Sequence, residues 1–166
     1  MLYVEILKNQ LPVIIKKVWR QVIFIEMAIF FVLTIAYLTL AYLFDWSYYW
    51  GSIGLVILLL LYFVEDKVIN SLRWHRFRFE IREEELEIAY GIIFRHRELI
   101  PMVRIQHVET TQGPLLRKAG LMTVDIHTAA TVHTILGLEE NQAEQLRNQI
   151  IALVKVAVED VLYTYK

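Results

Sequence analysis

The stretch from Val22 to Phe44 reads VIFIEMAIFFVLTIAYLTLAYLF and contains one ionisable residue, Glu26. After the break Asp45–Ser47, a second and uncharged run, YYWGSIGLVILLLLYFV, extends from Tyr48 to Val64. About twenty helical residues cross a hydrocarbon core of roughly 30 Å, because an α-helix rises about 1.5 Å per residue. The break is too short for anything except an antiparallel connection. The sequence therefore predicts a transmembrane helical hairpin over residues 22–69.

The overall composition agrees with a membrane protein. Of the 166 residues, 57% are hydrophobic and 21% are charged, whereas soluble domains are nearer to half apolar and a quarter charged. The net charge of -1 argues against a nucleic-acid partner. The absence of cysteine excludes disulfides, thiolate metal sites and cysteine nucleophiles. The first apolar run is too long for the core of a signal peptide, so we expect no cleaved signal.

Lysine and arginine flank the predicted hairpin at one end only. None lies in the connection, residues 45–52. Four precede the first span and four follow the second: Lys8, Lys16, Lys17, Arg20, Lys67, Arg73, Arg76 and Arg78. The positive-inside rule then places both termini in the cytoplasm and the connection outside.

Residues 1–21 form the lead into the first span. Trp19 stands beside Lys17 and Arg20, a composition typical of the membrane–water boundary. We therefore expect an interfacial segment, with a docking peptide as the alternative.

Glu26 is the one acidic residue within the first apolar run. An unpaired charge deep in a bilayer costs several kcal/mol, which makes such a residue a functional candidate. Its shallow depth favours a carboxylate that reaches back to interfacial water or is protonated. Pairing with a partner inside a helix bundle is the alternative. Glu65, Asp66 and Lys67 are expected at the headgroup level, so the apolar runs contain no second acid, histidine or lysine, and a transport or proton-relay role is disfavoured.

From residue 70 to residue 166 the periodicity changes from helical to alternating. Phe77, Phe79 and Ile81 alternate with charged residues, the pattern of a half-buried strand. Five further strands are predicted over residues 86–92, 94–100, 103–111, 121–128 and 132–138. An amphipathic helix begins near Asn141. The whole chain is therefore predicted to be an α+β membrane protein, in which the hairpin precedes a small split β-barrel capped by a C-terminal helix.

Four short motifs stand out in the strand-rich segment. They are IPMVRIQHV (residues 100–108), QGPLLRKAGL (112–121), VDIHT (124–128) and GL (137–138). Together they resemble the bacterial pleckstrin-homology (PH) domain of the second type, and the hairpin ahead of them resembles YdbS-like membrane proteins. The resemblance implies a PH-like barrel in the bacterial cytoplasm and a larger membrane partner that carries several such domains. It also implies a role in the response of the cell envelope to antimicrobial peptides.

Basic residues of this domain are candidate contacts for anionic lipid. The best-known eukaryotic PH domains hold phosphoinositides in the loop between their first two strands. Here that loop, residues 82–85, contains three adjacent glutamates that repel phosphate. The candidate lipid-facing residues are instead Arg76, Arg78, Arg117 and Lys118. Attraction to an anionic membrane surface contributes about 1 kcal/mol of binding free energy per basic residue. For Arg117 and Lys118, which follow a sharp turn at Gly113-Pro114, a structural role with both side chains in water is favoured over a ligand site.

The C-terminal helix carries two apolar stripes. The stripe expected to cap the barrel consists of Ala143, Leu146, Ile150, Leu153, Ala157 and Val161. The second, displaced by about 100°, consists of Ile151, Val154, Val158, Leu162 and Tyr165. A monomer would not expose such a stripe, so we expect a partner subunit or a second copy to bury it. The candidate partner interface comprises Glu26, Ile151, Val154, Val158 and Leu162, and attachment of the helix to the inner leaflet is the alternative.

No catalytic or metal-binding motif accompanies these features. The sequence has no HExxH, HxxxH, GxSxG or glycine-rich phosphate loop, so we expect no enzyme activity, no cofactor and no metal. His127 and His133 are expected to be cross-strand neighbours, with Asp125 as the acid near them.

These observations predict a non-enzymatic scaffold or interaction subunit of the bacterial inner membrane. We expect it to be multi-pass, with both termini cytoplasmic and membrane lipids around its spans. The expected partner is a larger paralogous membrane protein with several PH-like domains, or a second copy, and not a nucleic acid. An anionic-lipid-sensing module and an accessory subunit of a transporter are the alternatives.

Overall fold

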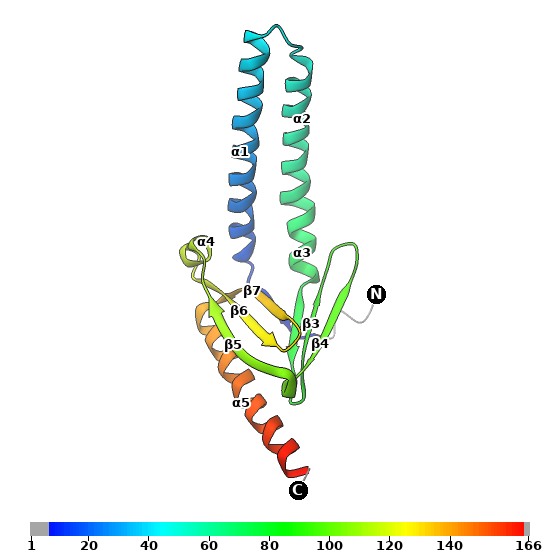
Figure 1. Cartoon of the computed structure of the whole chain (residues 1–166), viewed down its shortest axis with the longest axis vertical. Helices are drawn as coiled ribbons and strands as arrows, with labels where there is room; N and C mark the ends of the chain where they lie inside the picture. The colour runs from blue at the N-terminus through cyan, green and yellow to red at the C-terminus, as the bar shows by residue number, and fades with distance from the viewer. Residues whose placement is uncertain (1–6, 165–166) are drawn as a thin grey trace. The chain divides into compact units, whose positions relative to one another are not determined.

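The computed structural model describes residues 7–164, of which residues 160–162 and 164 are described by their backbone alone. The elements are β1 (Asn9–Gln10), α1 (Ile15–Leu43), α2 (Tyr49–Phe63), η2 (Val64–Ile69), α3 (Asn70–Arg76), β2 (Arg78–Ile81), β3 (Glu85–Tyr90), β4 (His96–Pro101), η3 (Met102–Arg104), β5 (Ile105–Thr111), α4 (Pro114–Lys118), β6 (Leu121–Thr128), β7 (Val132–Glu139) and α5 (Glu140–Thr164). They form two compact units (Figure 1). The helical unit comprises residues 16–72, and the β unit comprises residues 7–15 and 73–164.

Within the helical unit, α2 runs back beside α1 after a short connection (Figure 1). A side chain at Gly51 would collide with Leu38, so the glycine allows the helices to approach closely. By length and composition α1 is able to cross a membrane, and it is the one helix of the described residues that qualifies. The second helix differs from the prediction, because α2 has 15 residues and then becomes the π-helix η2.

The polar end of the helical unit is held by an ion pair. Arg20 Nε of α1 lies 3.0 Å from Asp66 Oδ1 of η2, and Lys67 approaches the other carboxylate oxygen at 3.6 Å. The change to π-helical geometry therefore falls where charged residues enter the sequence. A π-helical turn inside a helix is uncommon and is frequently found at functional positions.

The β unit contains two antiparallel sheets, with strand orders β1-β2-β3-β4 and β5-β6-β7. The predicted strands agree with β2 to β7 to within a few residues, and the predicted C-terminal helix is confirmed as α5. The first strand was predicted to begin at His75, whereas β2 begins at Arg78. The reason is that α3 continues to Arg76, and the backbone N–H of Phe77 still donates to Arg73 O at 3.0 Å. In the described residues no strand of one sheet pairs with a strand of the other, so a closed barrel stays a prediction.

The seventh strand comes from an unexpected place. In β1, Asn9 pairs with Phe79 and Gln10 with Arg78, at the edge of the first sheet. Trp74 Nε1 donates to Leu11 O at 2.8 Å, and Gln10 Nε2 donates to Trp74 O at 3.2 Å. Residues 7–15 therefore belong to the β unit. The interfacial position predicted for residues 1–21 stays a prediction, and residues 1–6 lie outside the described residues.

The core of the β unit follows the predicted alternation. Its buried residues include Phe79, Leu86, Ile88, Ile100, Met102, Ile105, Leu121, Val124, Ile126, Ile135 and Leu138. Phe77 and Ile81, also predicted as core, are half-buried. α5 contacts all three strands of the second sheet and buries the first half of its predicted stripe, Ala143, Leu146 and Ile150. Leu153 and Ala157 are half-buried, and the side chain of Val161 lies outside the described residues.

Gly137 tests whether the N-terminal segment packs on β7. Its φ is +80°, and a Cβ there would overlap the side chain of Ile15. Gly120 is a matched control, because its φ is +65° but nothing lies within 4 Å of an added Cβ. We expect Gly120→Ala to lower the free energy of unfolding by about 1–2 kcal/mol for the left-handed backbone. Gly137→Ala should cost about 1–3 kcal/mol more, for overpacking, in denaturant titrations in detergent.

Shortening Ile15 provides the second half of this test. In Gly137→Ala, the additional change Ile15→Ala should recover part of the lost stability, whereas in Gly120→Ala it should only destabilise. Equal losses for the two glycine variants would contradict the contact between the N-terminal segment and β7.

Candidate functional site

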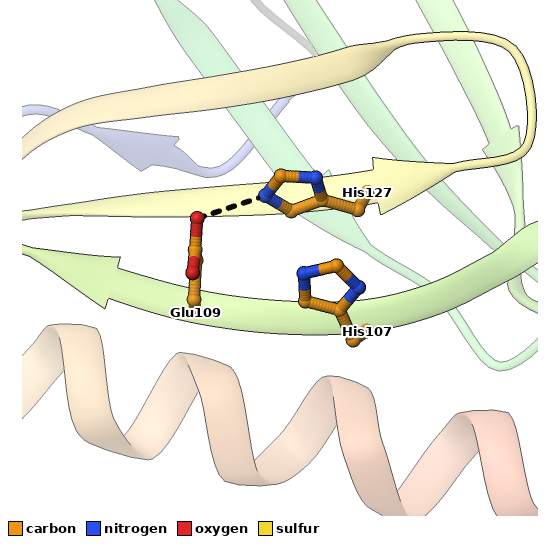
Figure 2. A group of neighbouring side chains, drawn as sticks. All are labelled: His107, Glu109 and His127. Atoms are coloured by element: carbon orange, nitrogen blue, oxygen red, sulfur yellow. Dashed lines mark hydrogen bonds and ion pairs between the residues drawn. The ribbon is translucent and has the colours of Figure 1, made fainter.

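Three side chains of types that bind metals meet on one face of the second sheet (Figure 2). His107 and Glu109 are two residues apart on β5 and so share a face, and His127 lies directly opposite His107 on β6. The two imidazole rings are stacked, with centroids 4.0 Å apart and an interplanar angle of 13°. His127 Nε2 lies 3.0 Å from Glu109 Oε1.

The same face carries a second acid that is fixed by hydroxyl groups. Asp125 lies opposite Glu109 across the β5–β6 pair. Thr111 Oγ1 donates to Asp125 Oδ2 at 3.0 Å, and Thr134 Oγ1 donates to Oδ1 at 2.7 Å. This network joins β5, β6 and β7 on their outer side. We call the group His107, Glu109, Thr111, Asp125, His127 and Thr134 the polar face.

The predicted pairing of His127 with His133 is wrong. His127 lies opposite Val132, whereas His133 lies opposite Ile126, whose side chain is buried. Because successive side chains alternate between the two sides of a strand, a difference of one residue in register moves His133 to the other face. The acid near His127 is Glu109 rather than Asp125.

On that other face, His133 takes part in a polar link between the two sheets. Its Nδ1 lies 2.6 Å from Glu98 Oε2 on β4, and Tyr90 OH donates to Glu98 Oε1 at 2.6 Å. Burial alone would raise the pKa of Glu98, but the hydrogen bonds from Tyr90 and His133 outweigh it and hold the pKa below its usual value. The same bond to Glu98 raises the pKa of Tyr90. This carboxylate thus stabilises the fold above the pKa of an unfolded glutamate, and the contribution is lost as the pH falls through its lower folded pKa.

Glu87 differs from the alternation expected of its strand. The sequence places it on the outward face of the second predicted strand, yet only 1% of its side chain is exposed. Arg97 forms an ion pair with it, and Arg82 Nη2 lies 3.5 Å from its second oxygen. A buried carboxylate is tolerated when cations surround it, which the single sequence does not reveal.

A shallow pocket of about 250 Å³ lies beside this ion pair. It is lined by Leu7, Arg76, Glu87, Ala89, Tyr90, Gly91, Arg95, His96 and Arg97. Of the predicted lipid-facing residues, Arg76 lines this pocket, and Arg78 is half-buried on β2, where burial lowers its pKa. Arg117 and Lys118 are exposed on α4 and do not line the pocket. The structure thus does not bring the four residues into one site.

Between β3 and β4 the chain exposes two large apolar residues, of which the second, Phe94, was predicted to begin a strand. Ile93 is 85% exposed and Phe94 is 78% exposed. The turn starts at Gly91, whose φ of +111° ends the strand earlier than the alternation suggests. Arg95 follows them directly and is exposed.

The predicted partner interface is only partly apparent in the structure. Ile151 and Val158 are 37% and 43% exposed, Val154 is half-buried, and the side chain of Leu162 lies outside the described residues. Glu26 is exposed on α1, and residues 7–164 show no hydrogen bond or ion pair to it.

Comparison with known proteins identifies the family. The family model described as "Bacterial PH domain" matches residues 11–154. The chain is 42% identical over 154 residues to the "UPF0699 transmembrane protein YdbS" of Bacillus subtilis (strain 168), which covers 93% of this chain and 97% of that protein. No solved structure matches the chain. This match over most of both lengths, together with the two-sheet β unit and its C-terminal helix, shows that the chain belongs to the bacterial PH domain family.

Proposed function

We propose that this protein is a non-enzymatic interaction subunit that spans the bacterial inner membrane twice and presents its β unit to the cytoplasm. The pairing of β1 with β2 is the observation that carries the topology. β1 precedes α1 and β2 follows α3, yet both belong to one sheet. A chain that leaves the β unit at Ile15 and returns at Arg73 crosses a membrane an even number of times.

The exposed surface of the helical unit supports the membrane as its surroundings. Large apolar side chains point outward along both helices, among them Phe24, Phe30, Val32, Leu43, Val56, Leu59 and Leu60. Leaving such surface in water costs about 25 cal/mol per Å², whereas lipid covers it without loss. The 15 residues of α2 and the 6 of η2 together reach the length of about 20 residues that a span needs.

Reporter fusions test this topology in cells. A reporter fused after Ser47 should lie outside the cytoplasm, and one fused after Lys166 should lie inside it. The reason is that Lys and Arg flank the spans at one end alone. The control moves charge: Lys residues introduced in place of Ser47 and Ser52 should reduce the external signal. Both reporters on the same side of the membrane would contradict the two-span arrangement.

The distal half of α5 supports the role as an interaction subunit. Its proximal half packs on the second sheet, while farther along the helix Ile151 and Val158, seven residues apart and so on the same side, are exposed apolar residues. An apolar helix face of this kind is used for docking more often than for contact with water. We propose that it binds a larger paralogous membrane protein with several PH-like domains, as the family resemblance implies. Resistance to antimicrobial peptides is the cellular role that we propose for this complex.

Serine substitutions in α5 test the interface. The variant Ile151→Ser, Val154→Ser, Val158→Ser should keep its folded β unit but lose its co-purifying partner in mild detergent. The control Lys155→Ser, Glu159→Ser changes exposed polar residues of the same helical turns. It loses at least as much helix propensity as the triple variant, because Lys and Glu are better helix formers than Ile and Val, and it should keep the partner. Size-exclusion chromatography with light scattering and mass spectrometry measures both. A complex that survives the triple change would move the interface elsewhere, with Glu26 as the next candidate.

Anionic lipid is a second candidate ligand, because of the exposed turn between β3 and β4. Ile93 and Phe94 are available to insert into a headgroup layer, with Arg95 beside them and Arg76 in the adjacent pocket. Apolar side chains flanked by basic ones are the composition of segments that bind an anionic membrane surface.

The absence of cysteine makes this second function easy to test. A fluorophore attached to Phe94→Cys, in the full chain in nanodiscs, should be shielded from an aqueous quencher when the lipid is anionic. Val132→Cys, exposed in the hairpin between β6 and β7, provides the control and should be quenched equally in anionic and zwitterionic lipid. Equal quenching of the Phe94 label in both lipids would contradict the lipid-sensing function.

A further inference from the structure

The geometry points to a site for a divalent transition-metal ion of the Zn²⁺ class on the polar face, held by His107, Glu109 and His127 (Figure 2). Each side chain offers one ligand atom, and these atoms all lie within 4.8 Å of one another. Ligands at about 2.0–2.2 Å from a tetrahedral metal lie about 3.3–3.6 Å from each other. The imidazole lone pair lies in the ring plane, so the two rings must turn out of their stack before a nitrogen of each can bind one ion. His107 and Glu109 are exposed, which leaves their side chains room to turn.

The scaffold of the site is rigid although its side chains are accessible. All three residues project from two paired strands, and the cross-strand partners His107 and His127 have a fixed separation. Asp125, held by Thr111 and Thr134, ties the neighbouring positions of β5, β6 and β7 together. A metal site on paired strands is positioned more accurately than one on loops.

The contacts within the cluster leave His107 without a polar partner in the described part of the chain. His127 and Glu109 are polar partners of each other, whereas His107 contacts the cluster by stacking on the ring of His127. In the described residues the ring nitrogens of His107 are therefore available to a metal. Neutral imidazole is the form that binds a metal.

The charges around the cluster favour a cation. Glu109 and Asp125 are direct cross-strand partners, and two carboxylates in that relation destabilise a sheet unless a positive charge or hydrogen bonds compensate them. The hydroxyls of Thr111 and Thr134 serve Asp125, which leaves Glu109 to the imidazole of His127 or to a bound ion.

The donor set also indicates the class of metal. Two imidazole nitrogens and one carboxylate oxygen suit Zn²⁺, Co²⁺, Ni²⁺ or Cu²⁺, whereas Mg²⁺ and Ca²⁺ prefer sites made of oxygen alone. Three protein ligands on an exposed strand face leave at least one coordination position for water or for a ligand from another molecule. The site is therefore of the open kind.

Cobalt binding to the full chain tests this inference. The protein is purified in detergent without a histidine tag, treated with a chelator and titrated with Co²⁺, whose visible absorption reports nitrogen and oxygen ligands. We expect one Co²⁺ per chain and its displacement by Zn²⁺. Loss of a residue that only orients a metal ligand weakens metal binding by about 10–100-fold. His107→Ala and His127→Ala each remove a ligand, so each should weaken Co²⁺ binding by more than that. Glu109→Gln should weaken binding and alter the spectrum.

His133→Ala is the matched control. His133 also faces a glutamate, Glu98, at 2.6 Å, but from the opposite side of the sheet, so its removal should leave Co²⁺ binding unchanged. Thermal unfolding of each metal-free variant shows whether the fold is intact, and the expected melting temperatures of the His107 and His127 variants are close to that of the parent. Absence of Co²⁺ and Zn²⁺ binding by the parent, or equal binding by the parent and His107→Ala, would overturn the site.

Discussion

The pairing of β1 with β2 is the contact on which the rest of this architecture depends. It joins residues that are separated by the whole helical unit, so the β unit is complete only after the second helical passage has returned. Trp74 strengthens the junction through its bond to Leu11 O, and Ile15 fills the space beside Gly137. Closing so long a loop is entropically costly. A preformed pair of helices reduces this cost, because it brings residues 15 and 73 together beforehand.

The same contact explains which parts of the fold were predictable. The strands β2 to β7 follow from alternation, and α5 from helical spacing, because each pattern is local in the sequence. β1 has only two residues, Asn9 and Gln10, and neither favours a strand. Its pairing is set by the buried Leu7 and Leu11 on either side and by a partner nearly seventy residues away. A local pattern does not contain such information.

The candidate site was less predictable for a related reason. Its residue types were visible in the sequence, but which of them meet depends on register between strands. The irregularity between Ile105 and His107 sets which β5 residues lie opposite β6, and the turn after Thr128 sends His133 to the inner face. One residue of slippage in either place would exchange the partners. The prediction therefore joined His127 to His133, whereas the structure joins it to His107 and Glu109.

The two histidine–glutamate pairs show how the surroundings assign different roles to one chemistry. His133 and Glu98 are half-buried where they link the two sheets, and Tyr90 supplies a further bond, so each oxygen of that carboxylate has a partner. His127 and Glu109 have no comparable enclosure and stand beside a second imidazole. A satisfied and partly buried pair stabilises the fold. An exposed pair contributes little to stability by itself, and its oxygen and nitrogen atoms stay accessible to a ligand.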